Sequence, residues 1–129
     1  MGPKDIENNQ CIVVRRDTRE KIVVSWDDIE TKLGEILEQM QADMFERALA
    51  HREEHTYDAT AFDEFCKIAE EKPGFIRAMW CGDQACEDKI KEEAGCTSRC
   101  MPFEQKELSD KCICCGRPAK KMVYWGKAY

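Results

Sequence analysis

The sequence lacks any long hydrophobic run. None of its apolar stretches approaches the roughly 20 residues that a helix needs to cross a bilayer. The first residues, Met-Gly-Pro-Lys-Asp-Ile-Glu, have neither the apolar centre of a signal peptide nor the arginine-rich, acid-poor character of a transit peptide. We therefore expect a cytoplasmic protein that has no membrane partner.

Positive charge is also in short supply. The 129 residues contain 20 Lys and Arg against 26 Asp and Glu, which gives a formal net charge of -6. Proteins that hold nucleic acid by broad electrostatic attraction carry basic faces, so this composition disfavours that class. The sequence also lacks a Gly-rich phosphate loop, a Ser-His-Asp set and a convincing pair of carboxylates. No active site is therefore predicted.

What the sequence does contain is typical of a small globular protein. Charged residues make up 36% of the chain, and aliphatic and aromatic residues are interspersed among them. The length suits one ordinary domain, or a small domain joined to a piece of another. A large multi-domain enzyme is excluded.

The N-terminal part reads as a hairpin followed by a long helix. The β-branched runs Cys11–Arg16 and Lys21–Ser25 are separated by four polar residues, which predicts two paired strands. A lone hairpin is marginal in water, so we expect the chain to begin partway through a domain. Ser25 and Asp28 have the form of a capping box, and helical apolar spacing then continues from Trp26 to about Glu53. Such a helix would be roughly 40 Å long, which suits an element that connects two bodies.

The remaining residues predict a two-layer α+β domain. Thr60 and Asp63 have the spacing of a helix cap, and Asp83 can cap a further helix that ends at Gly95. In chain order, we predict a helix that stops at Pro73-Gly74, a strand over Phe75–Trp80, a helix from Asp83 through Glu93, an extended segment over Thr97–Phe103, and a final strand over Lys121–Trp125.

The nine cysteines are the clearest chemical signal. Nine is an odd number, and without a secretory signal a disulfide framework is a poor explanation of them. Cys112 and Cys115 have the spacing of a metal-binding knuckle, and Cys81 and Cys86 form a second local pair at a strand end and a helix start. Two such pairs from separate segments are a common way to build a structural zinc site. We predict one zinc per chain, bound by these four thiolates, in a closed site that does not catalyse.

Other interpretations of the cysteines remain open. Cys114 and Cys100 are substitute ligands, because one adjoins the knuckle and the other lies on a segment that can pass nearby. Cys11 and Cys66 lie on apolar faces and suit buried free thiols. Cys112 and Cys115 would form a redox dithiol in a third interpretation, but the βαβ context of such motifs is not visible around them.

One further pattern has the form of a catalytic metal motif. His51, Glu54 and His55 match the short His-x-x-Glu-His pattern of one metalloprotease group. The pattern is short, and neither a third ligand nor a substrate cleft accompanies it. We interpret both histidines as solvated helix residues.

Six motifs follow one another along the chain: Gly2–Asp5, Val14–Thr18, Trp80–Asp83, Thr97–Phe103, the Cys112–Ala119 cluster and the ending Gly-Lys-Ala-Tyr. In this order they resemble the C-terminal part of prolyl-tRNA synthetase of the archaeal and eukaryotic type. The resemblance covers essentially the whole chain. It implies that residues 1–25 finish an anticodon-binding domain, residues 26–55 form a connecting helix, and residues 56–129 form a zinc-binding domain.

The resemblance also implies a function and a set of partners. The full enzyme would activate proline with ATP and Mg²⁺ and transfer it to its tRNA, as a homodimer whose catalytic and anticodon-binding domains lie upstream. Its zinc site carries over onto Cys81, Cys86, Cys112 and Cys115. Its terminal tyrosine corresponds to Tyr129, whose carboxylate would support the active site. Catalytic motifs are absent from this chain, so we expect no catalysis by it alone.

Two other functions compete with this one. A free-standing zinc ribbon that binds protein or nucleic acid is the first alternative, and the acidic charge counts against its nucleic-acid version. A dithiol oxidoreductase is the second. The sequence leaves open whether the chain is an excised fragment, which we favour, or a separately encoded domain.

Overall fold

The computed structural model describes residues 2–128 and divides the chain into two compact units, residues 1–50 and 51–129. Among the helices of the described residues, none is long and apolar enough to cross a membrane. The division at residues 25 and 55 stays a prediction.

The first unit contains the predicted hairpin. A short helix α1 (Pro3–Glu7) precedes strand β1 (Gln10–Val14), which pairs antiparallel with β2 (Lys21–Ser25). Arg15, which follows β1, is buried and donates hydrogen bonds to Asp17 in the hairpin loop and to Asp43 on the following helix. The hairpin loop is thereby fixed to that helix by a charged network.

The long helix is present, but it starts differently from the prediction. Ser25 caps a 3₁₀ turn, η1 (Trp26–Asp28), through a bond from the Asp27 N–H, and the α-helix α2 then runs over Ile29–Glu54. The predicted capping box with Asp28 is therefore wrong, because the chain forms the tighter turn before it becomes α-helical. No residue of α2 is buried.

The second unit is built on a four-stranded sheet. Its strands lie in the order β3 (Thr56–Asp58), β4 (Phe75–Trp80), β6 (Lys121–Lys127) and β5 (Cys96–Cys100). β3 runs parallel to β4, and the other pairs are antiparallel. The sequence reading missed β3, because three residues are too short for a periodic pattern. It also overextended β5, which ends at Cys100 rather than at Phe103.

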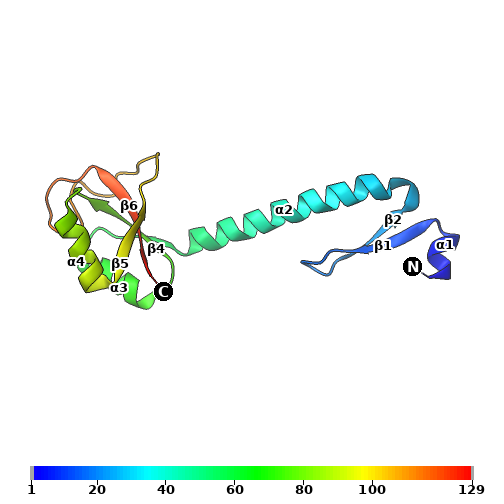
Figure 1. The fold of residues 1–129 in the computed structure, drawn as a ribbon, viewed down its shortest axis with the longest axis horizontal. Helices are drawn as coiled ribbons and strands as arrows, with labels where there is room; N and C mark the ends of the chain where they lie inside the picture. Colours follow the sequence, from blue (N-terminus) through cyan, green and yellow to red (C-terminus); the bar gives the residue numbers. More distant parts are fainter. Residues whose placement is uncertain (1, 129) are drawn as a thin grey trace. The chain divides into compact units, whose positions relative to one another are not determined.

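Two helices cover one face of this sheet, and the predicted α+β class is confirmed. Helices α3 (Phe62–Glu71) and α4 (Gln84–Ala94) lie side by side beside the strands (Figure 1). Trp125 of β6 is fully buried, with its ring edge-on to Phe65 of α3 and to Trp80 of β4. Ile90 of α4 and Val123 of β6 complete the centre of the core.

The helix ends show which local signals the chain uses. Asp83 caps α4 by accepting the Ala85 N–H, and Gly95 ends the helix at a φ of 66°, both as predicted. The predicted cap at Thr60 is wrong: Ala61 is the N-cap residue of α3 and gives no side-chain bond. The Thr60 N–H instead donates to the Glu64 carboxylate, which satisfies the backbone at this end by another route.

Candidate metal centre

The first cysteine pair is placed by the junction between β4 and α4. Cys81 directly follows the last residue of β4, and Cys86 lies in the first turn of α4. The Asp83 cap fixes where that helix begins, and the Cys86 N–H donates to the Asp83 carbonyl. The helical turn therefore presents Cys86 back toward the strand end.

The second pair lies on a tight turn that is attached to the sheet. The Cys112 N–H donates to the Arg117 carbonyl, and the Gly116 N–H donates back to the Cys112 carbonyl. The Ile113 N–H donates to the Met79 carbonyl of β4, at 2.9 Å. Strand β3 pairs with β4 only as far as Arg77, so the Met79 carbonyl lies beyond the end of β3 and can accept this bond from the turn. The knuckle thus occupies the position that a longer β3 would have taken.

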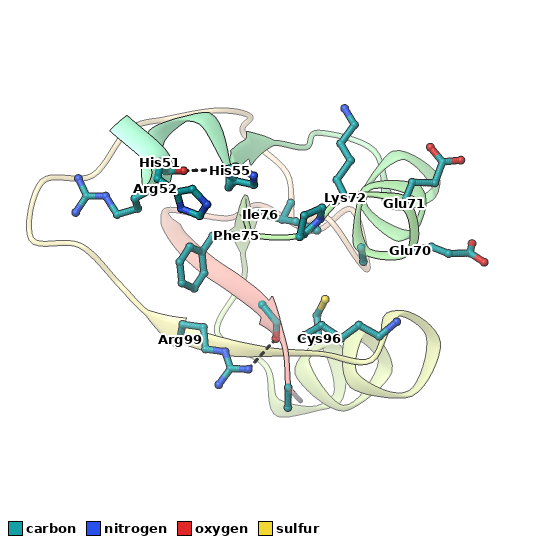
Figure 2. A pocket seen from close by; sticks show the side chains of 16 residues that line it. His51, Arg52, His55, Glu70, Glu71, Lys72, Phe75, Ile76, Cys96 and Arg99 are labelled. Carbon is teal, nitrogen blue, oxygen red and sulfur yellow. Dashed lines mark hydrogen bonds between the residues drawn. The ribbon is translucent and has the colours of Figure 1, made fainter. Parts of the chain in front are cut away.

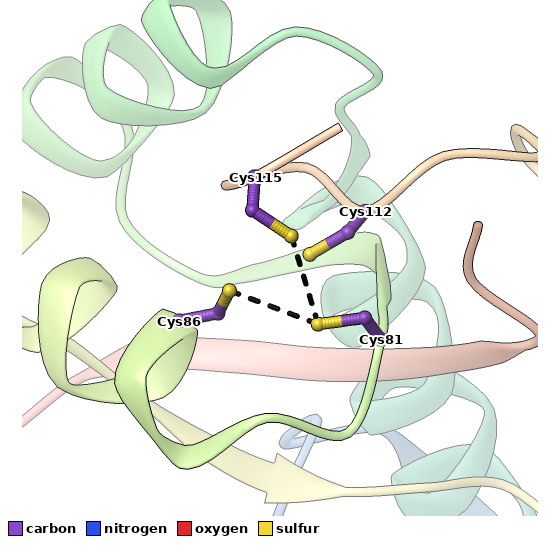
Figure 3. A group of neighbouring side chains, drawn as sticks. All are labelled: Cys81, Cys86, Cys112 and Cys115. Carbon is purple, nitrogen blue, oxygen red and sulfur yellow. Dashed lines mark hydrogen bonds between the residues drawn. The ribbon is translucent and has the colours of Figure 1, made fainter. Parts of the chain in front are cut away.

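The four sulfurs converge on one point (Figure 3). Cys81 Sγ lies 3.7 Å from Cys86 Sγ and 3.8 Å from Cys115 Sγ, and all four ligand atoms lie within 4.8 Å of one another. A disulfide would need a sulfur separation of about 2.0 Å. A tetrahedral zinc with Zn–S bonds of about 2.3 Å places its sulfurs about 3.8 Å apart. The cluster therefore has the spacing of a metal centre.

The cluster is closed on its inner side. Cys86 and Cys112 are buried, Cys81 is half-buried and Cys115 is exposed. Met79 and Met122 pack with the two buried cysteines in a small apolar core. This core separates the sulfurs from water on one side, as in a structural site rather than an open catalytic one.

The thiols of the cluster differ in acidity. Burial raises the pKa of Cys86 and of Cys81 above the ordinary value for a thiol. A hydrogen bond from Arg117 lowers the pKa of Cys115 to about 6. Metal ligands must be thiolates, so a cation that binds here would displace protons from the buried thiols.

The other cysteines stand apart from this group. All nine are free thiols. The metal-ligand group formed by the described residues consists of the four predicted cysteines, and neither Cys114 nor Cys100 belongs to it. Cys114 is half-buried within the knuckle, between Cys112 and Cys115, and Cys100 is exposed at the end of β5. Cys11 is buried and Cys66 half-buried, outside the cluster. The geometry favours the predicted four, and their role as ligands stays a prediction.

A contact that the sequence reading did not specify completes the cluster. Arg117 Nε donates to Cys115 Sγ at 3.3 Å, and Arg117 Nη2 lies 3.9 Å from Cys81 Sγ. The same guanidinium pairs with the Asp83 carboxylate, and this pairing lowers the pKa of Asp83. Arg117 lies two residues after Cys115 in the sequence, but only the tertiary structure brings it to Asp83, 34 positions away.

The second unit also contains a cavity, whose lining includes Cys96 but none of the four clustered cysteines (Figure 2). It has a volume of about 1100 Å³, and its lining includes His51, His55, Phe75 and Arg99. The two imidazole rings stack with centroids 4.2 Å apart, and His55 Nδ1 lies 2.8 Å from the His51 carbonyl oxygen. The two histidines of the pattern therefore lie against each other, and His55 follows the end of α2 at Glu54 instead of lying on the helix as predicted.

Comparison with known families identifies the fold that carries this cluster. The family model described as "Prolyl-tRNA synthetase, C-terminal" matches residues 62–129, which include all four clustered cysteines. The chain belongs to the prolyl-tRNA synthetase C-terminal family. Homologous proteins are proline–tRNA ligases, in agreement with the predicted resemblance.

Individual relatives extend the similarity to the whole chain. The protein named "Proline--tRNA ligase" from Clostridium novyi (strain NT) is 67% identical over 129 residues. The "Proline--tRNA ligase" of Lachnospira eligens is also 67% identical, and "Proline--tRNA ligase 2" of Bacillus thuringiensis subsp. konkukian is 57% identical. Each alignment covers 100% of this chain and 27% of the relative. The chain therefore spans about a quarter of the length of the synthetases that it matches.

Two predictions about the family stay untested. These relatives are bacterial, so the archaeal and eukaryotic type is not confirmed. The predicted role of the Tyr129 carboxylate lies outside the described residues.

Proposed function

We propose that this chain is the C-terminal structural zinc-binding region of a prolyl-tRNA synthetase of the archaeal and eukaryotic type. The convergence of Cys81, Cys86, Cys112 and Cys115 at tetrahedral spacing is the observation that carries the zinc assignment. The six ordered motifs support the type, and the family match supports the enzyme. The relatives named above come from bacteria, so the proposed type refers to the form of the enzyme and not to the source organism.

The zinc would act as a cross-link between segments that are distant in sequence. Four thiolates fill its coordination sphere and leave no position for water or substrate, so its contribution is folding free energy. Cys81 and Cys86 would hold the junction of β4 and α4, and Cys112 and Cys115 would hold the knuckle against the sheet edge. The four cysteines would thus join the junction of β4 and α4 to the knuckle through the metal.

The activity proposed for the full enzyme is attachment of proline to its tRNA, driven by ATP with Mg²⁺. The chain would support this reaction together with upstream catalytic and anticodon-binding domains, in a cytoplasmic homodimer. Tyr129 would contribute its carboxylate to the active site of that enzyme. The relatives are named proline–tRNA ligases, and their alignments cover the whole of this chain, which supports this part of the proposal.

Metal content is the direct test of the zinc site. Native mass spectrometry and elemental analysis of the purified chain should find one zinc, lost in Cys81→Ala and in Cys112→Ala. Cys66→Ala is the matched control, because this half-buried thiol lies on α3 outside the cluster. A folded chain without metal, or equal zinc in all four proteins, would contradict the assignment.

A chimera tests the link to aminoacylation. The chain replaces the aligned 129 residues of the Clostridium novyi Proline--tRNA ligase, to which it is 67% identical. The chimera should charge tRNA with proline, and a chimera that carries Cys112→Ala should lose zinc and charge less. A folded, zinc-loaded chimera that activates no proline would count against the synthetase function and leave the zinc site intact.

A further inference from the structure

Among the residues that the structure describes, Arg117 is the cationic side chain with hydrogen bonds to the clustered sulfurs. Its Nε donates to Cys115 Sγ at 3.3 Å, and its Nη2 lies 3.9 Å from Cys81 Sγ. One guanidinium therefore contacts a cysteine from each pair. Lys120 carries the same charge three residues later, yet within residues 2–128 no hydrogen bond or ion pair joins its ammonium group to a sulfur.

Asp83 holds this arginine in place. Its carboxylate pairs with Arg117 Nη2, while its Oδ1 accepts the Ala85 N–H at the start of α4. The same carboxylate thus fixes both the helix that carries Cys86 and the guanidinium that contacts Cys115. A planar guanidinium with several fixed donors can make these contacts together, which an ammonium group on a flexible stem cannot do.

We propose that Arg117, held by Asp83, is the positioning residue that orients the Cys115 and Cys81 sulfurs and strengthens metal binding at the cluster. The inference rests on the proposed zinc site. Four thiolates around one Zn²⁺ leave an excess of negative charge, and donors outside the ligand shell stabilise such a site and orient its ligands. Cys115 has the greatest need of this support, because it is the exposed member of the cluster.

The test is zinc affinity measured by competition with a chelator, at fixed pH, on the 129-residue chain. Arg117→Gln removes the donors and the charge, and we expect zinc binding to weaken about 10- to 100-fold, the usual effect of losing such a partner. Arg117→Lys should recover only part of the loss. Asp83→Asn keeps an oxygen for the helix cap but loses the ion pair, and should also weaken binding. Lys120→Gln is the control with the same charge change.

A second readout separates positioning from simple loss of charge or of folding. With zinc bound, alkylation of Cys115 should be faster in Arg117→Gln and in Arg117→Lys than in the wild type, because the exposed sulfur is held less firmly. Circular dichroism of the zinc-loaded variants confirms which of them are folded. Arg117→Lys serves as the folded variant in which charge is kept and the geometry is lost.

The outcomes distinguish this inference from the proposed function. A wild-type chain that binds no zinc overturns both. A wild-type chain with one zinc, together with an Arg117→Gln variant that binds as tightly as Lys120→Gln, overturns the role of Arg117 alone. Weaker zinc binding and faster alkylation in both Arg117 variants, with Lys120→Gln unchanged, support it.

Discussion

Gly74 is the position where one added methyl group should do the most damage to the second unit. It has a φ of 131°, and a Cβ built on it would lie 2.0 Å from the His55 carbonyl oxygen. That oxygen accepts the Phe75 N–H at 2.8 Å, where parallel pairing between β3 and β4 begins. The overlap is with backbone, so it cannot be relieved by rotating a side chain.

The magnitude of the Gly74→Ala effect follows from these contacts. The disallowed backbone conformation costs about 1–3 kcal/mol, and loss of the Phe75 hydrogen bond adds about 1 kcal/mol. We expect a loss of about 2–4 kcal/mol in the free energy of unfolding. A domain of the size of the second unit has a total stability of only about 4–12 kcal/mol, so this loss should clearly lower the midpoint of a urea titration.

Gly95→Ala is the matched control for Gly74→Ala. It also replaces a glycine at positive φ, 66°, but its Cβ would meet only the flexible Lys127 side chain, at 3.4 Å. We expect a cost of about 1 kcal/mol there. Both variants are compared at equal metal content. The hydrogen-exchange rate of the Phe75 amide then shows whether its bond to the His55 carbonyl, at the start of β4, is kept. Equal costs for the two variants would refute the close approach of Gly74 to His55.

Three other perturbations test different parts of the chain. Ile90→Ala should destabilise the second unit by about 2–5 kcal/mol in urea unfolding, because this side chain is fully buried, whereas the exposed Phe103→Ala should change it by less than about 0.5 kcal/mol. Removing metal with a chelator should lower the melting temperature of the second unit, since zinc at 1,000 times its dissociation constant stabilises the folded state by about 4 kcal/mol; an unchanged melting temperature would argue against a structural metal. The Arg15 hydrogen bond lowers the pKa of Asp17 in the folded chain, so the stability that it contributes is present above about pH 4 and lost as the pH falls further. An acid titration followed by circular dichroism should show this loss, and Arg15→Gln should flatten it.

The sequence by itself determined the elements whose signals are local. The β-branched runs on either side of the hairpin loop predicted β1 and β2, and the Asp83 cap with Gly95 predicted both ends of α4. A cap, a left-handed glycine and a strand alternation each act within a few residues, so a single sequence is enough to read them. The spacing of the cysteines is also a local signal, because each pair is placed by one local turn.

Only the tertiary structure decided where these local pieces meet. The strand β3 is too short to predict, and it exists because β4 offers it an edge. Likewise, Ile113 binds the Met79 carbonyl only once the knuckle has folded back on β4. The 3.8 Å separation of the Cys81 and Cys115 sulfurs and the ion pair between Arg117 and Asp83 each join residues that are 34 positions apart in the chain. Such contacts form when burial of the core brings the segments together, and no short-range pattern in the sequence encodes them.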